Sequence, residues 1–215
     1  MRDKRYKLTL SDIWYYYKIH FFVAMAIIIA IVYTVYSTVT KVEPDFTIDC
    51  FSDTGITYEM TDKLEELINS SGTVADVDGD EAVVTGVSSF PTGLSSPNGD
   101  PNYIQVIQLR MAVGESPIIM AEPRVFEMYD ESGVFMDITH IADECNIPDQ
   151  DRLIFDGKVL GIRVDNSKLF ADNGFTSTDL FISLRTPTYD IQKNEALMKA
   201  FGYAEDVAKY IIKGN

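Results

Sequence analysis

The chain reads FFVAMAIIIAIVYTVYSTV over residues 21–39, nineteen residues without a charge. As a helix this run would extend about 28 Å, close to the roughly 30 Å hydrocarbon core of a bilayer. We therefore expect a transmembrane signal anchor over residues 19–40. The alternatives are a cleaved signal peptide and a buried helix of a soluble fold. A cleaved signal peptide fits poorly, because the run is long and ends in aromatic and hydroxyl residues rather than at a small-residue cleavage site.

The charges on either side of the run predict its orientation. Five basic and two acidic residues precede residue 21, a net of +3, and the whole chain carries −15, so residues 21–215 carry −18. Basic flanks stay in the cytoplasm. We expect residues 1–18 inside the cell as a basic and aromatic tail, and residues 41–215 outside it as one domain. The expected location is the cell membrane, with a single span and a cytoplasmic N-terminus. An aromatic collar suited to the headgroup region supports this: Trp14, Tyr15, Tyr16 and Tyr17.

Composition excludes several classes of partner and site. A net charge of −18 outside the tail argues against nucleic acid, which needs clustered Lys and Arg. Cys50 and Cys145 both fall outside, where a disulfide is permitted, although Cys50 also fits a small buried residue of a core strand. We expect no metal site, because His140 is the only histidine outside the membrane and no Cys/His spacing repeats.

An acidic turn at residues 75–81, ADVDGDE, invites comparison with a calcium loop. An EF-hand that starts at Asp76 needs Gly at its sixth position and Glu at its twelfth, and these positions hold Glu81 and Val87. We expect a solvated turn, with a weak cation site as the alternative. Its carboxylates belong to Asp76, Asp78, Asp80 and Glu81.

Strand and helix patterns alternate through the outer domain. Strands are expected at residues 45–52, 82–87, 117–121, 158–164 and 179–184, and a loop at 88–99. Helices are expected at residues 60–71, 101–113, 123–132 and from about 194 onward. In the second of these, Tyr103, Val106, Ile107 and Met111 are expected to face inward. The alternation predicts an α/β fold with helices on both faces of a sheet.

Three segments resemble a known family. The chain reads SPIIMAEPRVFEMYDESGVFMDIT at 116–139, GKVLGIRVDNSKLFADNGF at 157–175 and DLFISLRTPTYDIQKNEALMKAFGYAEDVAKYII at 179–212. In this order they are similar to segments of the extracellular solute-binding proteins of bacterial ABC transporters. WYYYKIHFF at 14–22, with the span that follows it and PDFTI at 44–48, also resembles uncharacterised membrane-anchored proteins of gut Firmicutes. The first resemblance implies a periplasmic-binding-protein-like α/β lobe.

A solute-binding protein clamps its ligand between two lobes. Here the crossover at 157–173 leads almost at once into the closing strand at 179–184, so we expect a single lobe. A ligand would then meet one open surface rather than an enclosed site.

Candidate binding residues follow from the strand ends, because ligands of open α/β sheets bind outside the carboxyl ends of the strands. Ser52, Asp53 and Thr54 follow the first strand, and Glu122 and Arg124 follow the strand at 117–121. The hydroxyls can donate hydrogen bonds, and Arg124 can pair with an anionic group. In the family that the segments resemble, these loops touch ligand. The alternative is ordinary capping of the helices that follow.

These features predict a non-catalytic, single-pass membrane protein that presents a solute-binding-like lobe outside the cell. Its expected role is an accessory or sensory binding component of a membrane transport complex, with a membrane protein as partner and no cofactor. One alternative is a receptor that captures a small-molecule ligand and is completed by dimerisation or a partner lobe. The other is a surface enzyme, which the lack of a G-x-S-x-G or P-loop motif disfavours.

Overall fold

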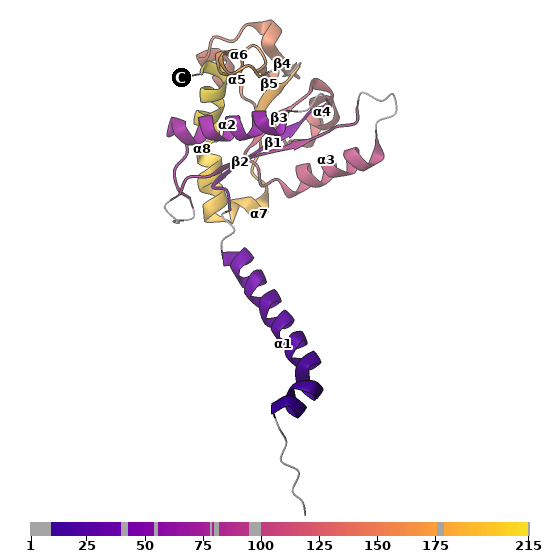
Figure 1. The fold of residues 1–215 in the computed structure, drawn as a ribbon. Coiled ribbons are helices and arrows are strands. Elements are labelled where there is room, and N and C mark those ends of the chain that lie inside the picture. The colour runs from indigo at the N-terminus through magenta and orange to yellow at the C-terminus, as the bar shows by residue number, and fades with distance from the viewer. Residues whose placement is uncertain are drawn as a thin grey trace, which may run out of the picture. The chain divides into compact units, whose positions relative to one another are not determined.

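The computed structural model describes most of the chain (Figure 1). The described residues are 10–39, 43–53, 56–77, 79, 82–94, 100–175 and 179–214. The chain forms two compact units, Met1–Glu43 and Pro44–Asn215, and each is treated by itself.

The first unit contains one helix, α1, among its described residues, which runs over Leu10–Val39. Its segment Tyr17–Tyr36 is long and apolar enough to cross a membrane. The prediction of a long apolar helix is confirmed, and its position in a membrane stays a prediction. The helix starts well before the charge-free run, so the aromatic collar lies on the same helix as the span.

The second unit is built on one sheet of six strands in the described residues, ordered β2-β1-β3-β6-β5-β4. The neighbours β2, β1 and β3 are parallel, whereas β6, β5 and β4 continue the sheet in antiparallel pairs. The predicted α/β class is therefore confirmed, with a mixed sheet. The strands are β1 Phe46–Phe51, β2 Thr85–Phe90, β3 Ile118–Ala121, β4 Arg152–Phe155, β5 Lys158–Arg163 and β6 Phe181–Leu184.

Buried side chains form two clusters in the described residues, one on each face of the sheet. The larger cluster lies under α2 (Tyr58–Ser71), α5 (Thr139–Glu144), α6 (Lys168–Asn173) and α8 (Glu195–Lys213). The smaller lies under α3 (Pro101–Val113) and α4 (Pro123–Tyr129). Alternate residues of β1 supply both clusters, since Ile48 and Cys50 belong to the first and Phe51 to the second. Short elements complete the chain: η1 Asp130–Ser132, η2 Asp149–Asp151 and α7 Tyr189–Gln192.

Local signals explain where the main helices begin and end. Asp100 caps α3 by accepting a hydrogen bond from the backbone of Asn102, and Pro101 occupies the first turn. Asn194 caps α8 in the same way. Helices α2 and α3 end at Gly72 and Gly114, both in the left-handed conformation that glycine tolerates.

Two sequence expectations are wrong in this region. Strand β2 runs to Phe90, so residues 88–90 are strand and not loop. The strand is longer than expected because these residues pair with the end of β1 and the ring of Phe90 stacks on that of Phe51, with 5.5 Å between the ring centroids. Tyr103 and Val106 do not face inward, and are 39% and 38% exposed. The inner stripe of α3 is formed by Ile107 and Met111 alone.

Candidate functional site

The carboxyl ends of β1, β2 and β3 meet at one edge of the sheet, because the three strands are parallel. This edge is called the carboxyl edge. The chain leaves β1 for β2 on one side and later returns to β3 on the other. Such a divergence point is where open α/β sheets bind ligands. This edge is opposite to the one at which the chain enters the domain at Pro44.

Glu122 joins the ends of β1 and β3. Its backbone N–H donates to the carbonyl of Phe51 at 3.1 Å. One carboxylate oxygen, Oε1, accepts a hydrogen bond from the Ser52 hydroxyl at 2.9 Å and another from the backbone N–H of Asp53. The Glu122 side chain thus fixes the first turn of the loop after β1.

The loop after β2 joins the same network. The Thr92 hydroxyl donates to Oδ1 of Asp53 at 2.6 Å, and its oxygen accepts from the backbone N–H of Leu94 at 3.3 Å. The guanidinium of Arg124, from the first turn of α4, donates to the carbonyl of Leu94. Hydrogen bonds therefore tie the loops after β1, β2 and β3 into one surface.

A glycine between Thr92 and Leu94 lets this loop approach α3. Gly93 has a φ of +63°, and a Cβ placed there would lie 2.7 Å from a ring carbon of Tyr103. A larger residue would force the loop and the start of α3 apart.

The structure brings together four of the five predicted site residues: Ser52, Asp53, Glu122 and Arg124. Thr54 lies outside the described residues. Ser52 is buried, Asp53 and Glu122 are half-buried, and Arg124 is exposed. Their role in ligand binding stays a prediction.

In the described contacts, the side chains of Ser52 and Glu122 do not cap the helices that follow them. The cap of α2 is Thr57, and Glu122 stands at the start of α4 without a side-chain capping bond. Their polar groups connect loops instead. Thr92 was not anticipated, because the strand before it was expected to end before residue 88.

A buried ion pair lies under α3, on the face of β1 opposite to Cys50. The guanidinium of Arg185 lies 4.0 Å from the carboxylate of Asp49 and donates to the carbonyls of Ser116 and Met111, both at 2.9 Å. Burial raises the pKa of Asp49, while a hydrogen bond from Ser116 and nearby positive charges oppose that rise. Burial lowers the pKa of Arg185, and the charge of Asp49 opposes this. The pair fastens the end of α3 to the sheet and has no exposed surface to offer a ligand.

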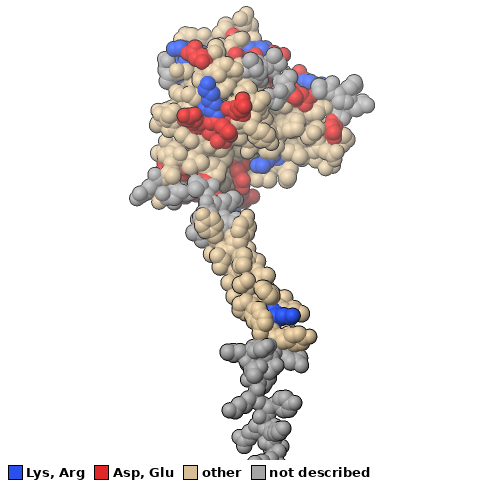
Figure 2. All heavy atoms as spheres, in the orientation of Figure 1, with Lys and Arg blue, Asp and Glu red and all other residues tan. Residues whose placement is uncertain are grey.

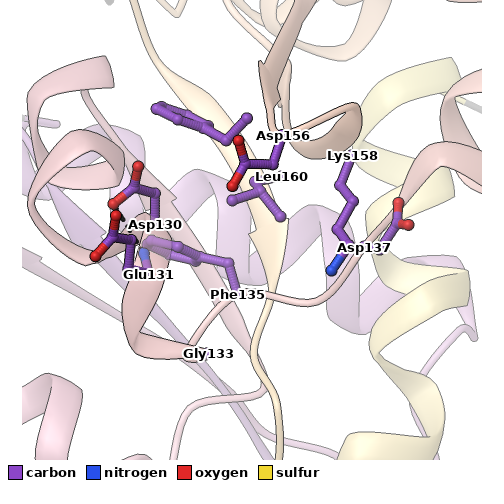
Figure 3. A pocket seen from close by; sticks show the side chains of 9 residues that line it. Asp130, Glu131, Gly133, Phe135, Asp137, Asp156, Lys158 and Leu160 are labelled. Atoms are coloured by element: carbon purple, nitrogen blue, oxygen red, sulfur yellow. Dashed lines mark hydrogen bonds between the residues drawn. The ribbon is translucent and has the colours of Figure 1, made fainter.

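A pocket of about 310 Å³ lies near the start of β5, away from the carboxyl edge (Figure 3). Phe135 and Leu160 form part of its apolar wall, and the only basic side chain among its lining residues is Lys158. Hydrogen bonds from the hydroxyl and backbone N–H of Thr139 lower the pKa of Asp137. The balance of charge suits a positively charged group, and the volume lies at the lower end of the range for small-molecule sites. Its carboxylates come from Asp130, Glu131, Asp137 and Asp156.

The remaining candidates have ordinary surroundings. The His140 ring lies 3.4 Å from Glu205 and is exposed. Asp76 accepts a hydrogen bond from the backbone N–H of Gly79 at 2.6 Å, as in a polar turn, while Asp78, Asp80 and Glu81 lie outside the described residues. Cys50 and Cys145 are free thiols. Within the described ranges, no group of three or more His, Cys, Asp or Glu side chains is placed to hold a metal ion.

Comparisons of the chain with models of protein families, with curated proteins and with solved structures found no match.

Proposed function

We propose that this chain is a single-pass membrane protein whose outer domain is a non-catalytic binding module. It serves as an accessory or sensory component of a membrane transport complex. The observation that carries the proposal is the network at the carboxyl edge of the sheet, in which Glu122, Asp53 and Arg124 hold three loops together.

The length of the apolar helix supports the membrane anchor, and the charges on either side of it support the orientation. The apolar part of α1 covers 20 residues, enough for one span. The net charge of +3 before residue 21 favours a cytoplasmic N-terminus, and the −18 that follows favours a soluble outer domain.

The carboxyl edge supports binding because its loops are already ordered by hydrogen bonds. A surface that is fixed before its partner arrives loses less conformational entropy on association. The exposed Arg124 offers hydrogen-bond donors to a carboxylate or another anionic group of the partner.

The same residues support a non-catalytic role. Ser52 is buried, and its hydroxyl donates to Glu122 rather than to an imidazole. A serine nucleophile would need an accessible hydroxyl next to a general base.

The pocket near the start of β5 favours a second candidate function, the capture of a small ligand by this domain alone. The ligand would carry a positive charge to match the carboxylates and an apolar body to contact Phe135 and Leu160.

The full-length protein in lipid nanodiscs tests both functions. Thermal unfolding of the outer domain would be measured by calorimetry against sugars, amino acids, short peptides, anions, amines and divalent ions. A ligand at 100 times its Kd adds about 2.7 kcal/mol, which raises the Tm by several degrees. If Arg124→Ala abolishes a Tm shift and Lys199→Ala, an exposed control on α8, does not, the site is at the carboxyl edge. A shift by amines that Asp156→Asn abolishes places the ligand in the pocket.

A protein partner would give no shift with any compound. Photo-crosslinking from position 124 in native membranes should then capture a membrane protein, whereas crosslinking from position 199 should not. The proposal fails if neither ligands nor crosslinks distinguish the two positions.

A further inference from the structure

The pocket near the start of β5 has an apolar wall that the core of the domain holds in place. Phe135 and Leu160 line this wall and are only 6% and 5% exposed. The ring of Phe135 stacks on that of Phe126, with 4.5 Å between the ring centroids. Phe155 of β4 adds a third apolar side chain. Packing therefore fixes a surface that an apolar group of a ligand can contact.

The charged side chains of the pocket are spread around this wall. In Figure 3, Asp130 and Glu131 lie on one side of Phe135, and Lys158 lies on the other. Within the part of the chain that the structure describes, no three carboxylates converge in a way that would hold a metal ion. The arrangement therefore suits an organic molecule with charged groups at separate ends better than a bare cation.

Both kinds of charge in the pocket have free hydrogen-bonding groups. In the described contacts, the side chains of Glu131 and Asp156 accept no hydrogen bond, and the ammonium group of Lys158 forms no hydrogen bond or ion pair. The positive charge of Lys158 does act on Asp137, whose pKa it helps to lower. A carboxylate can only accept and an ammonium can only donate. A ligand that uses both therefore needs a cationic donor and an anionic acceptor.

Negative charge alone cannot select such a ligand. Residues 21–215 carry a net −18, and Figure 2 shows acidic side chains at several places on the visible face of the domain. Every cation is therefore attracted to the domain. Lys158, the only basic side chain among the lining residues, distinguishes ligands, because a ligand without an anionic group leaves its ammonium unpaired.

We propose that the pocket binds a short zwitterionic peptide of apolar residues, about two residues long, and that Lys158 selects for its free C-terminus. The N-terminal ammonium pairs with Asp130 and Glu131, and the C-terminal carboxylate pairs with Lys158. The apolar side chains contact Phe135 and Leu160. The inference rests on the second candidate function, ligand capture in this pocket, and names the class of ligand.

The length of the peptide follows from the volume of the pocket and the separation of its charges. A volume of about 310 Å³ is at the lower end of the range for small-molecule sites, which excludes a long peptide. Two extended residues span about 7 Å, so a dipeptide carries its charges at separate ends. The two charges of a single amino acid are adjacent, and they cannot reach both sides of Phe135 together.

Matched ligands test each end of the peptide separately. The full-length protein in lipid nanodiscs would be titrated by calorimetry with leucyl-leucine, its C-terminal amide, its N-acetyl derivative and leucine. We expect leucyl-leucine to bind roughly fivefold more tightly than the other three compounds, because each of them lacks one charged end or the length to form both pairings.

Substitutions then assign each end to its residue. Lys158→Met should bind leucyl-leucine and its amide with equal affinity. Glu131→Gln should narrow the difference in affinity between leucyl-leucine and its N-acetyl derivative. Lys199→Met and Glu127→Gln, exposed controls on α8 and α4, should leave both preferences unchanged.

Failure of this inference and failure of the functions proposed above give different results. If the amide binds wild type as tightly as leucyl-leucine and Asp156→Asn abolishes both, the pocket accepts amines in general and only the peptide assignment is wrong. If Arg124→Ala instead of Lys158→Met removes the preference for a free carboxylate, the ligand lies at the carboxyl edge and the assignment to this pocket is wrong.

Two further results would contradict the proposal. If leucine binds as tightly as leucyl-leucine, the ligand does not bridge the two ends of the pocket. If none of the four compounds binds, both the peptide assignment and ligand capture by the pocket fail, whereas the function of the carboxyl edge is unaffected.

Discussion

Arg185 and Asp49 form an ion pair with only 1% and 4% of their side chains exposed, at an Nη2–Oδ2 distance of 4.0 Å. The guanidinium also binds the carbonyls of Met111 and Ser116, at the end of α3 and just beyond it. The last carbonyls of a helix have no partner within it, so Arg185 supplies a donor to Met111, in the last turn of α3. The pair therefore connects β1, the residue after β6 and the end of α3.

Replacing Arg185 should destabilise the domain strongly. Arg185→Met removes the ion-pair partner of the buried Asp49, with Arg110 left as a nearby positive charge, and leaves the carbonyl of Met111 without this donor. We expect a loss of about 3 kcal/mol in the free energy of unfolding. Urea denaturation followed by near-UV circular dichroism measures it. Arg163→Met is the comparison: its side chain is 24% exposed, and it pairs with Asp151, Asp165 and Asp179 nearer the surface, so its loss should be smaller than that of Arg185→Met.

The double variant Asp49→Asn/Arg185→Met distinguishes the effect of the lost ion pair on stability from the effect of lost packing around Arg185. Because the buried charge of Asp49 is then gone, this variant should be more stable than Arg185→Met alone. Equal losses for Arg185→Met and Arg163→Met would contradict the importance of the buried pair.

Much of the fold is predictable because its signals are local. The caps at Asp100 and Asn194 and the glycines that end α2 and α3 are all visible in the sequence. The hairpin of β4 and β5 was not anticipated, although Asp156 and Gly157 both have positive φ, at 47° and 76°, as in a tight hairpin turn. Strand β5 is predicted from the sequence and β4 is not, because a bulge between Leu153 and Ile154 interrupts the alternation of apolar residues that would have indicated β4.

The candidate site was predictable in part for a similar reason. Ser52 and Glu122 were expected near each other because parallel strands end at one edge. Thr92 was not, because the end of β2 is set by pairing with β1 and not by its own sequence. The pairing of Asp49 with Arg185 depends on strand order, which brings β6 next to β3 and cannot be read from local patterns.

The contacts between α5 and α8 should make stability depend on pH. Lys209 lies 2.6 Å from Glu144 and 2.8 Å from Glu205, and these bonds lower the pKa of both carboxylates below the usual 4.5. Carboxylates with a lowered pKa stabilise the folded state above their unfolded pKa, and that stabilisation is lost as pH falls through the folded pKa. Lys209→Met should therefore lower the Tm by roughly 1–4 °C at pH 7. The difference from wild type should shrink as pH falls below 4.5 and vanish once pH is below the lowered pKa of both carboxylates.

Salt provides an independent check on Lys209. At 1 M salt the Debye length is about 3 Å, so the difference between wild type and Lys209→Met should shrink at pH 7. Lys199→Met, on the exposed side of the same helix, should show little dependence on either variable. A Tm difference for Lys209→Met that is constant from pH 7 to pH 3 would indicate lost packing instead of lost charge pairing.

The two thiols should differ in reactivity. Cys50 is fully buried, and burial together with the charges of Glu122 and Asp49 raises its pKa. Burial also raises the pKa of Cys145, which is only half-buried. With Ellman's reagent at pH 8 we expect Cys145 to react slowly in the native protein and Cys50 only after denaturation, since the thiolate is the reactive form.

Counting thiols in the denatured protein without reductant completes this test. Two reactive groups are expected, and Cys145→Ser should leave none in the native state. A count of zero in the denatured wild type would show that the cysteines pair.

Glu122 should be the residue on which the order of the carboxyl edge depends. Glu122→Ala removes the acceptor of both the Ser52 hydroxyl and the Asp53 backbone N–H, so we expect a loss of about 1–3 kcal/mol in the free energy of unfolding. Glu122→Gln keeps a carbonyl oxygen at the same place and should cost less. Glu127→Ala, an exposed carboxylate on the same helix, should change stability by no more than about 0.5 kcal/mol.

Hydrogen exchange at the Asp53 amide distinguishes local order from global stability. In wild type this N–H is protected by Glu122, and in Glu122→Ala it should exchange much faster under conditions in which the core amides of β1 remain protected. If the Asp53 amide keeps its protection, another group orders the loop, and the carboxyl edge cannot be a surface that Glu122 organises for binding. If protection is lost while the domain stays folded, Glu122→Ala becomes the variant with which to ask whether partner binding requires an ordered edge.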